Sequence, residues 1–150
     1  MNAAALAVLL SMFVMVGLQW SGLPERIPTH YNVAGEPNKW SPKGGALLLP
    51  VVGAGLFLLL TALSGLKGTL NVPVGTTLPA YADTPEARAE IKRTMATLKL
   101  AIMVGFAYVT WRMVGTPDQG LGPWFMPVFL LGTAGTALAY CVRLRHLRRS

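Results

Sequence analysis

The feature that most constrains this chain is a set of four long apolar segments. Three of them contain no charged residue, and the remaining one, the third along the chain, contains one lysine and one arginine. A helix needs about 20 apolar residues to cross the hydrocarbon core of a bilayer. The sequence therefore predicts an all-α fold, a bundle of four transmembrane helices. The predicted spans are residues 3–20, 46–66, 94–114 and 123–142.

The composition excludes most classes of soluble protein. Of the 150 residues, 53% are hydrophobic and only 13% are charged, whereas about 25% of the residues of a typical soluble domain are charged. A soluble globule of this size needs more polar surface than this chain supplies. We therefore predict a single membrane domain over residues 1–150 and exclude disorder and an ordinary soluble enzyme.

The net charge of +7 would suit a nucleic-acid-binding protein, but the positive charge is concentrated at the C-terminus. Four arginines lie in the last eight residues, directly after the fourth apolar segment. A basic tail beside an apolar span is typical of a cytoplasmic anchor. The expected partner is therefore the lipid bilayer, and no nucleic acid is expected.

The distribution of lysine and arginine predicts the orientation, because cytoplasmic loops carry an excess of these residues. The loop between the second and third segments holds four of them and the tail holds four more, against three in the first loop and none in the third. This predicts a multi-pass protein with both termini in the cytoplasm. Lys99 and Arg112 are expected to extend to the lipid head groups. Arg112 has a second candidate partner in Asp118 or in an acid of the first loop.

Two helix boundaries follow from local signals. Residues 3–20 are preceded by no lysine or arginine and followed by no small-residue cleavage site, so we expect a retained helix and not a signal peptide. Asp83 and Thr84 are capping residues, and Pro85 and Glu86 suit the first turn of a helix. The third helix is therefore predicted to begin near residue 85, before its apolar segment.

The outer loop, residues 21–43, is the most distinctive part of the chain. It is rich in proline, which stiffens it, and we expect an ordered loop between the first two helices. If residues 27–33 are extended, His30 and Asn32 share one face. Residues 34–37 are predicted to form a turn in which Gly35 adopts a positive φ. The following residues return toward the membrane, with Trp40 at the interface.

The spacing in this loop follows the pattern L-P-x-x-I-P-x-H-x-N-x-x-G-E-P-x-x-W-x-x-K. It resembles the signature loop of an N-terminal domain of unknown function in SdpI-type bacterial membrane proteins, which give immunity against a secreted killing peptide. The resemblance covers the first helix, the loop and the start of the second helix. It implies six spans in the immunity proteins, whereas this sequence has four. The matching residues are Leu23, Pro24, Ile27, Pro28, His30, Asn32, Gly35, Glu36, Pro37, Trp40 and Lys43.

The resemblance implies a protein of the bacterial inner membrane with a binding or sensing role at its outer face, in immunity or signalling. Candidate partners are an extracellular peptide, a lipid head group and another membrane protein. His30 and Asn32 would supply hydrogen bonds to the ligand, Gly35 would shape the turn, and Glu36 would supply charge. The residues expected to shape the loop are Pro24, Pro28, Pro37, Trp40 and Lys43.

Other interpretations stay open beside this one. His30 and Asn32 are equally suited to hydrogen-bond the backbone of their own loop. A small transporter or channel subunit, a structural partner of a larger membrane complex and a homo-oligomer are alternatives. Along the fourth segment, small residues such as Gly132 and Gly135 are each followed by another small residue four positions later, which predicts close packing of helices in the bundle and identifies no partner. We expect no enzyme activity, since no catalytic motif is found. No cofactor and no metal site are expected either, since the single cysteine, Cys141, lies far from His30.

Overall fold

The structure is a computed structural model that describes residues 2–65 and 85–147. Asp83 and Thr84, the predicted helix cap, lie outside these ranges, as do the last two arginines of the tail. The described part is mostly helical, and it contains four helices long and apolar enough to cross a membrane. The predicted four-helix fold is therefore confirmed. The helices are α1 (Asn2–Gln19), α2 (Leu48–Gly65), α3 (Pro85–Gly115) and α4 (Phe125–Leu147).

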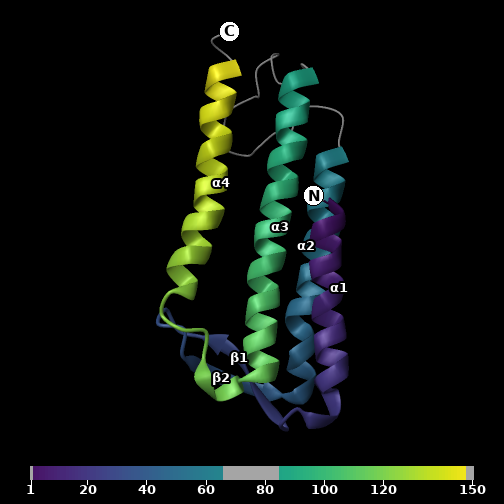
Figure 1. The fold of residues 1–150 in the computed structure, drawn as a ribbon, viewed down its shortest axis with the longest axis vertical. Coiled ribbons are helices and arrows are strands. Elements are labelled where there is room, and N and C mark those ends of the chain that lie inside the picture. Colours follow the sequence, from purple (N-terminus) through teal and green to yellow (C-terminus); the bar gives the residue numbers. More distant parts are fainter. Residues whose placement is uncertain (1, 66–84, 148–150) are drawn as a thin grey trace.

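Successive helices run in opposite directions, and the chain between α1 and α2 forms a hairpin at one end of the bundle (Figure 1). The hairpin consists of β1 (Arg26–Tyr31) and β2 (Pro37–Pro42), paired antiparallel. Two 3₁₀ turns, η1 (Trp20–Gly22) and η2 (Lys43–Leu47), join it to the helices. We call this end of the molecule the hairpin end. The ordered segment that we predicted as a loop thus contains a small sheet.

The extended segment is shorter than the predicted 27–33. β1 ends at Tyr31, and its pairing with β2 is irregular on both sides of His30. Ile27 and Pro28 are both buried although they are neighbours in the strand, so the alternation of faces does not hold here. Proline has no backbone N–H to donate to the partner strand, so prolines in strands are commonly found at bulges, where one residue is left out of the pairing.

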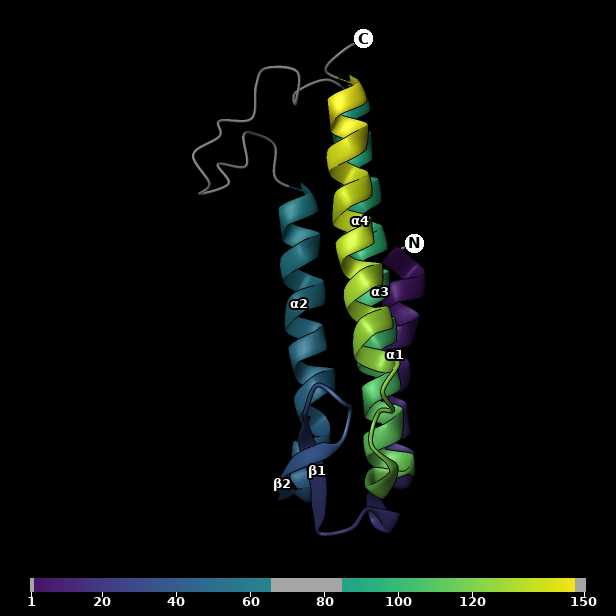
Figure 2. The ribbon, with the colours of Figure 1, turned by 90° about the vertical axis from the view of Figure 1, so that its left-hand side faces the viewer.

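Helix α3 is the centre of the bundle and packs against each of the other three helices. Figure 2 views the bundle from a second side, from which α4 lies in front of α3. Two clusters of buried residues hold α3 to α1. Most other apolar side chains on the helices are exposed, as expected for surfaces that face lipid. The cluster in the middle of the bundle is Ala5, Leu9, Met12 and Met103. The cluster at the hairpin end is Val16, Leu23, Ile27, Ala46, Met113 and Val114.

Helix α4 packs mainly against α3, through aromatic rings. Tyr108 of α3 stacks on Phe125 with ring centroids 5.0 Å apart, and Phe125 stacks on Phe129 at 5.6 Å. Gly105 lies directly under the Phe129 ring, where a Cβ atom would overlap it. By contrast, Gly132 and Gly135 have nothing within 4 Å of a Cβ position. These two glycines therefore do not mediate packing within the chain, as their spacing had suggested.

Lys99 does not extend to the head groups as predicted. Its side chain is fully buried inside the bundle, where the ammonium donates a hydrogen bond of 2.8 Å to the hydroxyl of Thr61 on α2. The same ammonium lies 4.9 Å from the centre of the Phe57 ring. The side chain turns inward because α2 offers an oxygen and an aromatic face to the charge, and both compensate for the lost solvation.

This contact gives a prediction for stability. Thr61→Val leaves the buried ammonium of Lys99 without its oxygen, which costs about 1–3 kcal/mol for an unsatisfied buried group. Thermal unfolding in detergent, followed by circular dichroism, measures the loss. Thr61→Ser is the matched control, since it keeps the hydroxyl and should melt close to the wild type. Equal melting of Thr61→Val and wild type would mean that the hydroxyl does not stabilise the charge.

Candidate functional site

Asn32 organises the tip of the hairpin. Its side-chain oxygen accepts hydrogen bonds from the backbone amides of Ala34 (3.0 Å) and Glu36 (2.9 Å). Its side-chain amide donates to the Glu36 carboxylate at 2.9 Å, and its backbone pairs with that of Gly35 and of Glu36. Asparagine is suited to this position because its short side chain can replace backbone partners in a turn. Asn32 and Glu36 are therefore both engaged within the loop.

His30 is the exposed polar residue of the hairpin that keeps a free ring nitrogen. Its Nδ1 lies 2.6 Å from the side-chain oxygen of Asn38. A carbonyl oxygen can only accept, so Nδ1 carries the proton in this contact. Asn38 thus orients the ring, and Nε2 is left to interact with a partner outside the hairpin.

Gly35 joins the hairpin to the connection between α3 and α4. It adopts φ +79°, as the predicted turn requires, and its carbonyl oxygen accepts a 2.6 Å hydrogen bond from the Leu121 amide. A Cβ atom at Gly35 would meet the carbonyl oxygen of Gly122, and one at Gly120 would meet that of Gly35. Two segments far apart in sequence approach this closely only because glycines stand on both sides.

Arg112 holds the same connection from the end of α3. Its guanidinium donates to the carbonyl oxygen of Gly120 at 2.6 Å and to that of Gln119 at 3.2 Å. The predicted pairing with Asp118 or with an acid of the first loop is not found among the described residues. Backbone carbonyls bind the guanidinium instead of a carboxylate. They lie at the end of a short 3₁₀ turn, η4 (Pro117–Gln119), where carbonyl oxygens are left without a helical partner.

Tyr31, the last residue of β1, lies near Arg112. Its hydroxyl is buried and has no hydrogen-bond partner among the described residues, and the same is true of the hydroxyl of Thr116. Burial raises the pKa of Tyr31 from its ordinary 10.0 to about 12, because a phenolate would lose its hydration there, and the charge of Arg112 lowers it to a smaller extent.

An open groove runs between the hairpin and the start of α2, with a volume of about 560 Å³. One wall is polar and comes from both strands, and the other wall is formed by η2 and the first turn of α2. Of the four predicted ligand-binding residues, only His30 lines it. The lining residues are Thr29, His30, Lys39, Ser41, Gly44, Gly45, Leu47, Leu48 and Val51.

The residues expected to shape the loop have distinct places. Pro28 is buried opposite Trp40 across the strands, and Pro37 opens β2 opposite Tyr31. The ammonium of Lys43 lies 5.2 Å from the centre of the Trp20 ring. Pro24 is exposed between η1 and β1.

Several residues of the site were missed by the sequence analysis. The hydroxyls of Thr29 and Ser41 lie 2.8 Å apart across the strands, and Lys39 pairs with His30 in the register. The available signal was the hairpin itself, since a turn centred on residues 32–36 makes 41 a diagonal neighbour of 29 and brings 39 within one residue of the position opposite 30. Leu121 and its glycine neighbours carried no comparable signal.

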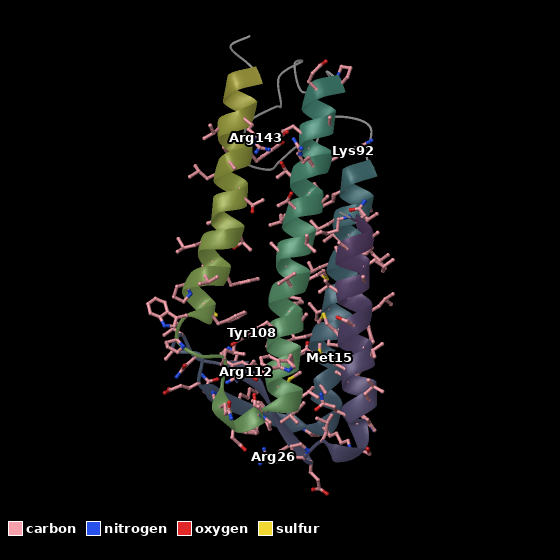
Figure 3. The ribbon with its side chains drawn as sticks, viewed as in Figure 1. Met15, Arg26, Lys92, Tyr108, Arg112 and Arg143 are labelled. Atoms are coloured by element: carbon pink, nitrogen blue, oxygen red, sulfur yellow. The ribbon has the colours of Figure 1, made fainter. Side chains whose placement is uncertain are left out.

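The four tryptophans of the chain gather at the hairpin end. Three of them lie at or near the end of a span, the fourth lies in β2, and each is more than a third exposed: Trp20 40%, Trp40 37%, Trp111 48% and Trp124 78%. Tryptophan is enriched at the level of the lipid head groups. Figure 3 shows Arg26 and Arg112 at this end, and Lys92 and Arg143 toward the other. The hairpin therefore lies at one predicted membrane surface.

The match to known families falls on this end of the molecule. Residues 7–54 match the family described as a domain of unknown function, DUF1648. This region covers most of α1, the whole hairpin and the first turns of α2. No curated protein and no solved structure matches the chain.

The close approach at Gly35 gives a second prediction. Gly35→Ala places a side chain at a positive φ and against the Gly122 carbonyl, so it should lower the free energy of unfolding by about 1–3 kcal/mol. It should also speed hydrogen exchange at the Leu121 amide. Gly22→Ala, at the same end but with open space around its Cβ position, is the control and should leave both unchanged. Slow exchange of Leu121 in Gly35→Ala would contradict this account of the docking.

The raised pKa of Tyr31 predicts a pH dependence. Because the folded value of about 12 exceeds the ordinary 10.0, the contribution of Tyr31 to stability is fully present below pH 10 and is lost as the pH rises from 10 to about 12. Absorbance of the phenolate near 295 nm, taken as the difference between wild type and Tyr31→Phe, reports the titration. A midpoint near 10 would show that the hydroxyl is not buried.

Proposed function

We propose that this multi-pass membrane protein has a binding or sensing role at its hairpin end. The observation that carries the proposal is the open groove between the hairpin and the start of α2, which His30 lines together with residues of both strands. Ligand sites are concave and mostly apolar, with a few directed polar groups. The groove has this character, and the hairpin is held in place by its docking on the α3–α4 connection.

The four candidate residues have three roles within this proposal. His30 contacts the ligand, because its Nε2 is exposed and its ring is oriented by Asn38. Asn32 and Gly35 position the hairpin, since their polar groups are used within the turn and against Leu121. Glu36 supplies charge at the tip while bonded to Asn32. This division joins the two interpretations of the loop that the sequence left open.

The finer assignment follows from the resemblance to SdpI-type proteins. It supports a bacterial inner-membrane location, with both termini in the cytoplasm and the hairpin outside, and a role in immunity or signalling without catalysis. The excess of lysine and arginine in the opposite loop and tail supports this orientation. A peptide or a membrane protein would then reach the groove from the outer side.

The test compares two variants of the hairpin. His30→Ala removes the proposed ligand contact and one exposed side-chain bond to Asn38, but none of the bonds within the turn. We therefore expect protein level and melting temperature close to those of the wild type but loss of any co-purifying ligand in native mass spectrometry. Asn32→Ala removes the two side-chain bonds to the backbone amides of the turn and should lower both ligand binding and stability. If His30→Ala reduces the melting temperature as much as Asn32→Ala does, the histidine is structural and the proposed binding role is wrong.

A small transporter or channel subunit remains the second candidate, and Lys99 is the observation that favours it. A buried cation within a span is costly and commonly marks a path for ions or substrates. Its partners here are the Thr61 hydroxyl and the Phe57 ring, on α2. Ion flux across proteoliposomes that depends on Lys99 would favour this alternative over the binding role.

A further inference from the structure

We propose that the groove binds the head group of an anionic phospholipid from the leaflet at the hairpin end, with Lys39 contacting the phosphate. This inference rests on the proposed binding role and names the class of ligand. It is carried by the position of the groove in the membrane, by the separation of its polar and apolar walls, and by the charge of its lining.

The position of the groove matches that of a lipid head group. The exposed tryptophans place the boundary of the bilayer at the hairpin end. The groove crosses this boundary, since its polar wall belongs to the hairpin and its apolar wall to the start of α2. A lipid in the surrounding leaflet therefore reaches the groove by lateral diffusion, without leaving the bilayer.

The apolar wall is suited to an acyl chain. Leu48 and Val51 are 53% and 59% exposed, so they face the space that lipid chains occupy. They continue the groove along α2 in the direction of the membrane interior. A volume of about 560 Å³ lies within the range of about 300–1,000 Å³ found for small-molecule sites, and it suits a head group with the first part of its chains.

The polar wall offers hydrogen bonds of the kind that a phosphodiester accepts. In the pair formed by Thr29 and Ser41, one hydroxyl donates to the other, and the hydroxyl that accepts keeps its own proton free. That proton can be donated to a phosphate oxygen. Lys39, from the strand position opposite His30, adds a cation.

The sign of the charge selects an anionic lipid. The groove lining contains one lysine and no aspartate or glutamate. His30 adds an acceptor when its ring is uncharged, because Nδ1 then carries the proton donated to Asn38 and Nε2 keeps a lone pair. A head group that combines a phosphate with hydroxyl groups, as phosphatidylglycerol does, satisfies both: the phosphate meets Lys39, and a hydroxyl donates to His30.

The experiment titrates the purified full-length protein in mild detergent with phosphatidylglycerol and with phosphatidylcholine of the same chains, and counts bound lipid by native mass spectrometry. Lys39→Gln should weaken the binding of phosphatidylglycerol about tenfold, the equivalent of one charge-assisted hydrogen bond. Two matched controls replace cations outside the groove. Arg26→Gln lies at the same end and Lys92→Gln at the other (Figure 3), and both should bind as the wild type does.

Three results would overturn the inference. Equal weakening in all three variants would show unspecific attraction of lipid to positive charge. Equal binding of phosphatidylcholine would show that the groove does not select an anion. Release of the lipid by millimolar inorganic phosphate would show that the ligand is a soluble phosphate.

The proposed binding role has its own readout, so the two can fail separately. If the lipid result fails while His30→Ala still removes a co-purifying ligand, the groove is a site for another class of molecule. If neither lipid nor any other mass depends on Lys39 or His30, both proposals fall.

Discussion

The docking of the hairpin tip on the α3–α4 connection is the contact on which the arrangement of this end depends. The Leu121 amide donates to the Gly35 carbonyl, and glycines on both sides allow the backbones to meet. Arg112 secures the connection by binding its carbonyl oxygens. The contact links the first and last thirds of the chain, so a two-stranded hairpin, which alone is marginally stable, gains a rigid support.

The bundle behind the hairpin is organised around α3. Because lipid offers no hydrogen bonds, each span satisfies its own backbone as a helix, and polar side chains must find partners inside. Lys99 does so through Thr61 and Phe57, and the threonines of α3 and α4 bond to carbonyls one turn earlier. Helix α4 is held through stacked rings, and it leaves its glycines open to the surroundings.

The hairpin combines two tasks that the sequence could not separate. The polar groups of Asn32 and Gly35 form hydrogen bonds within the turn and to Leu121, whereas His30 forms a single side-chain bond and lines the groove. The residues that hold the turn therefore follow the exposed histidine along one short segment. The groove exists because η2 turns the chain from the sheet into α2, and Gly45 lets this turn approach Thr29 closely.

The sequence by itself determined the four helices, because the length of an apolar segment and the absence of charge suffice for a span. It also indicated the ordered segment between the first two helices and the positive φ of Gly35, since proline and glycine restrict the backbone locally. Only the tertiary structure decided the rest. The inward turn of Lys99, the carbonyl partners of Arg112 and the contact of Gly35 with Leu121 all join residues distant in the chain. Hydropathy and local spacing indicate whether a side chain prefers an apolar or a polar environment. They do not indicate which distant segment of the chain provides that environment.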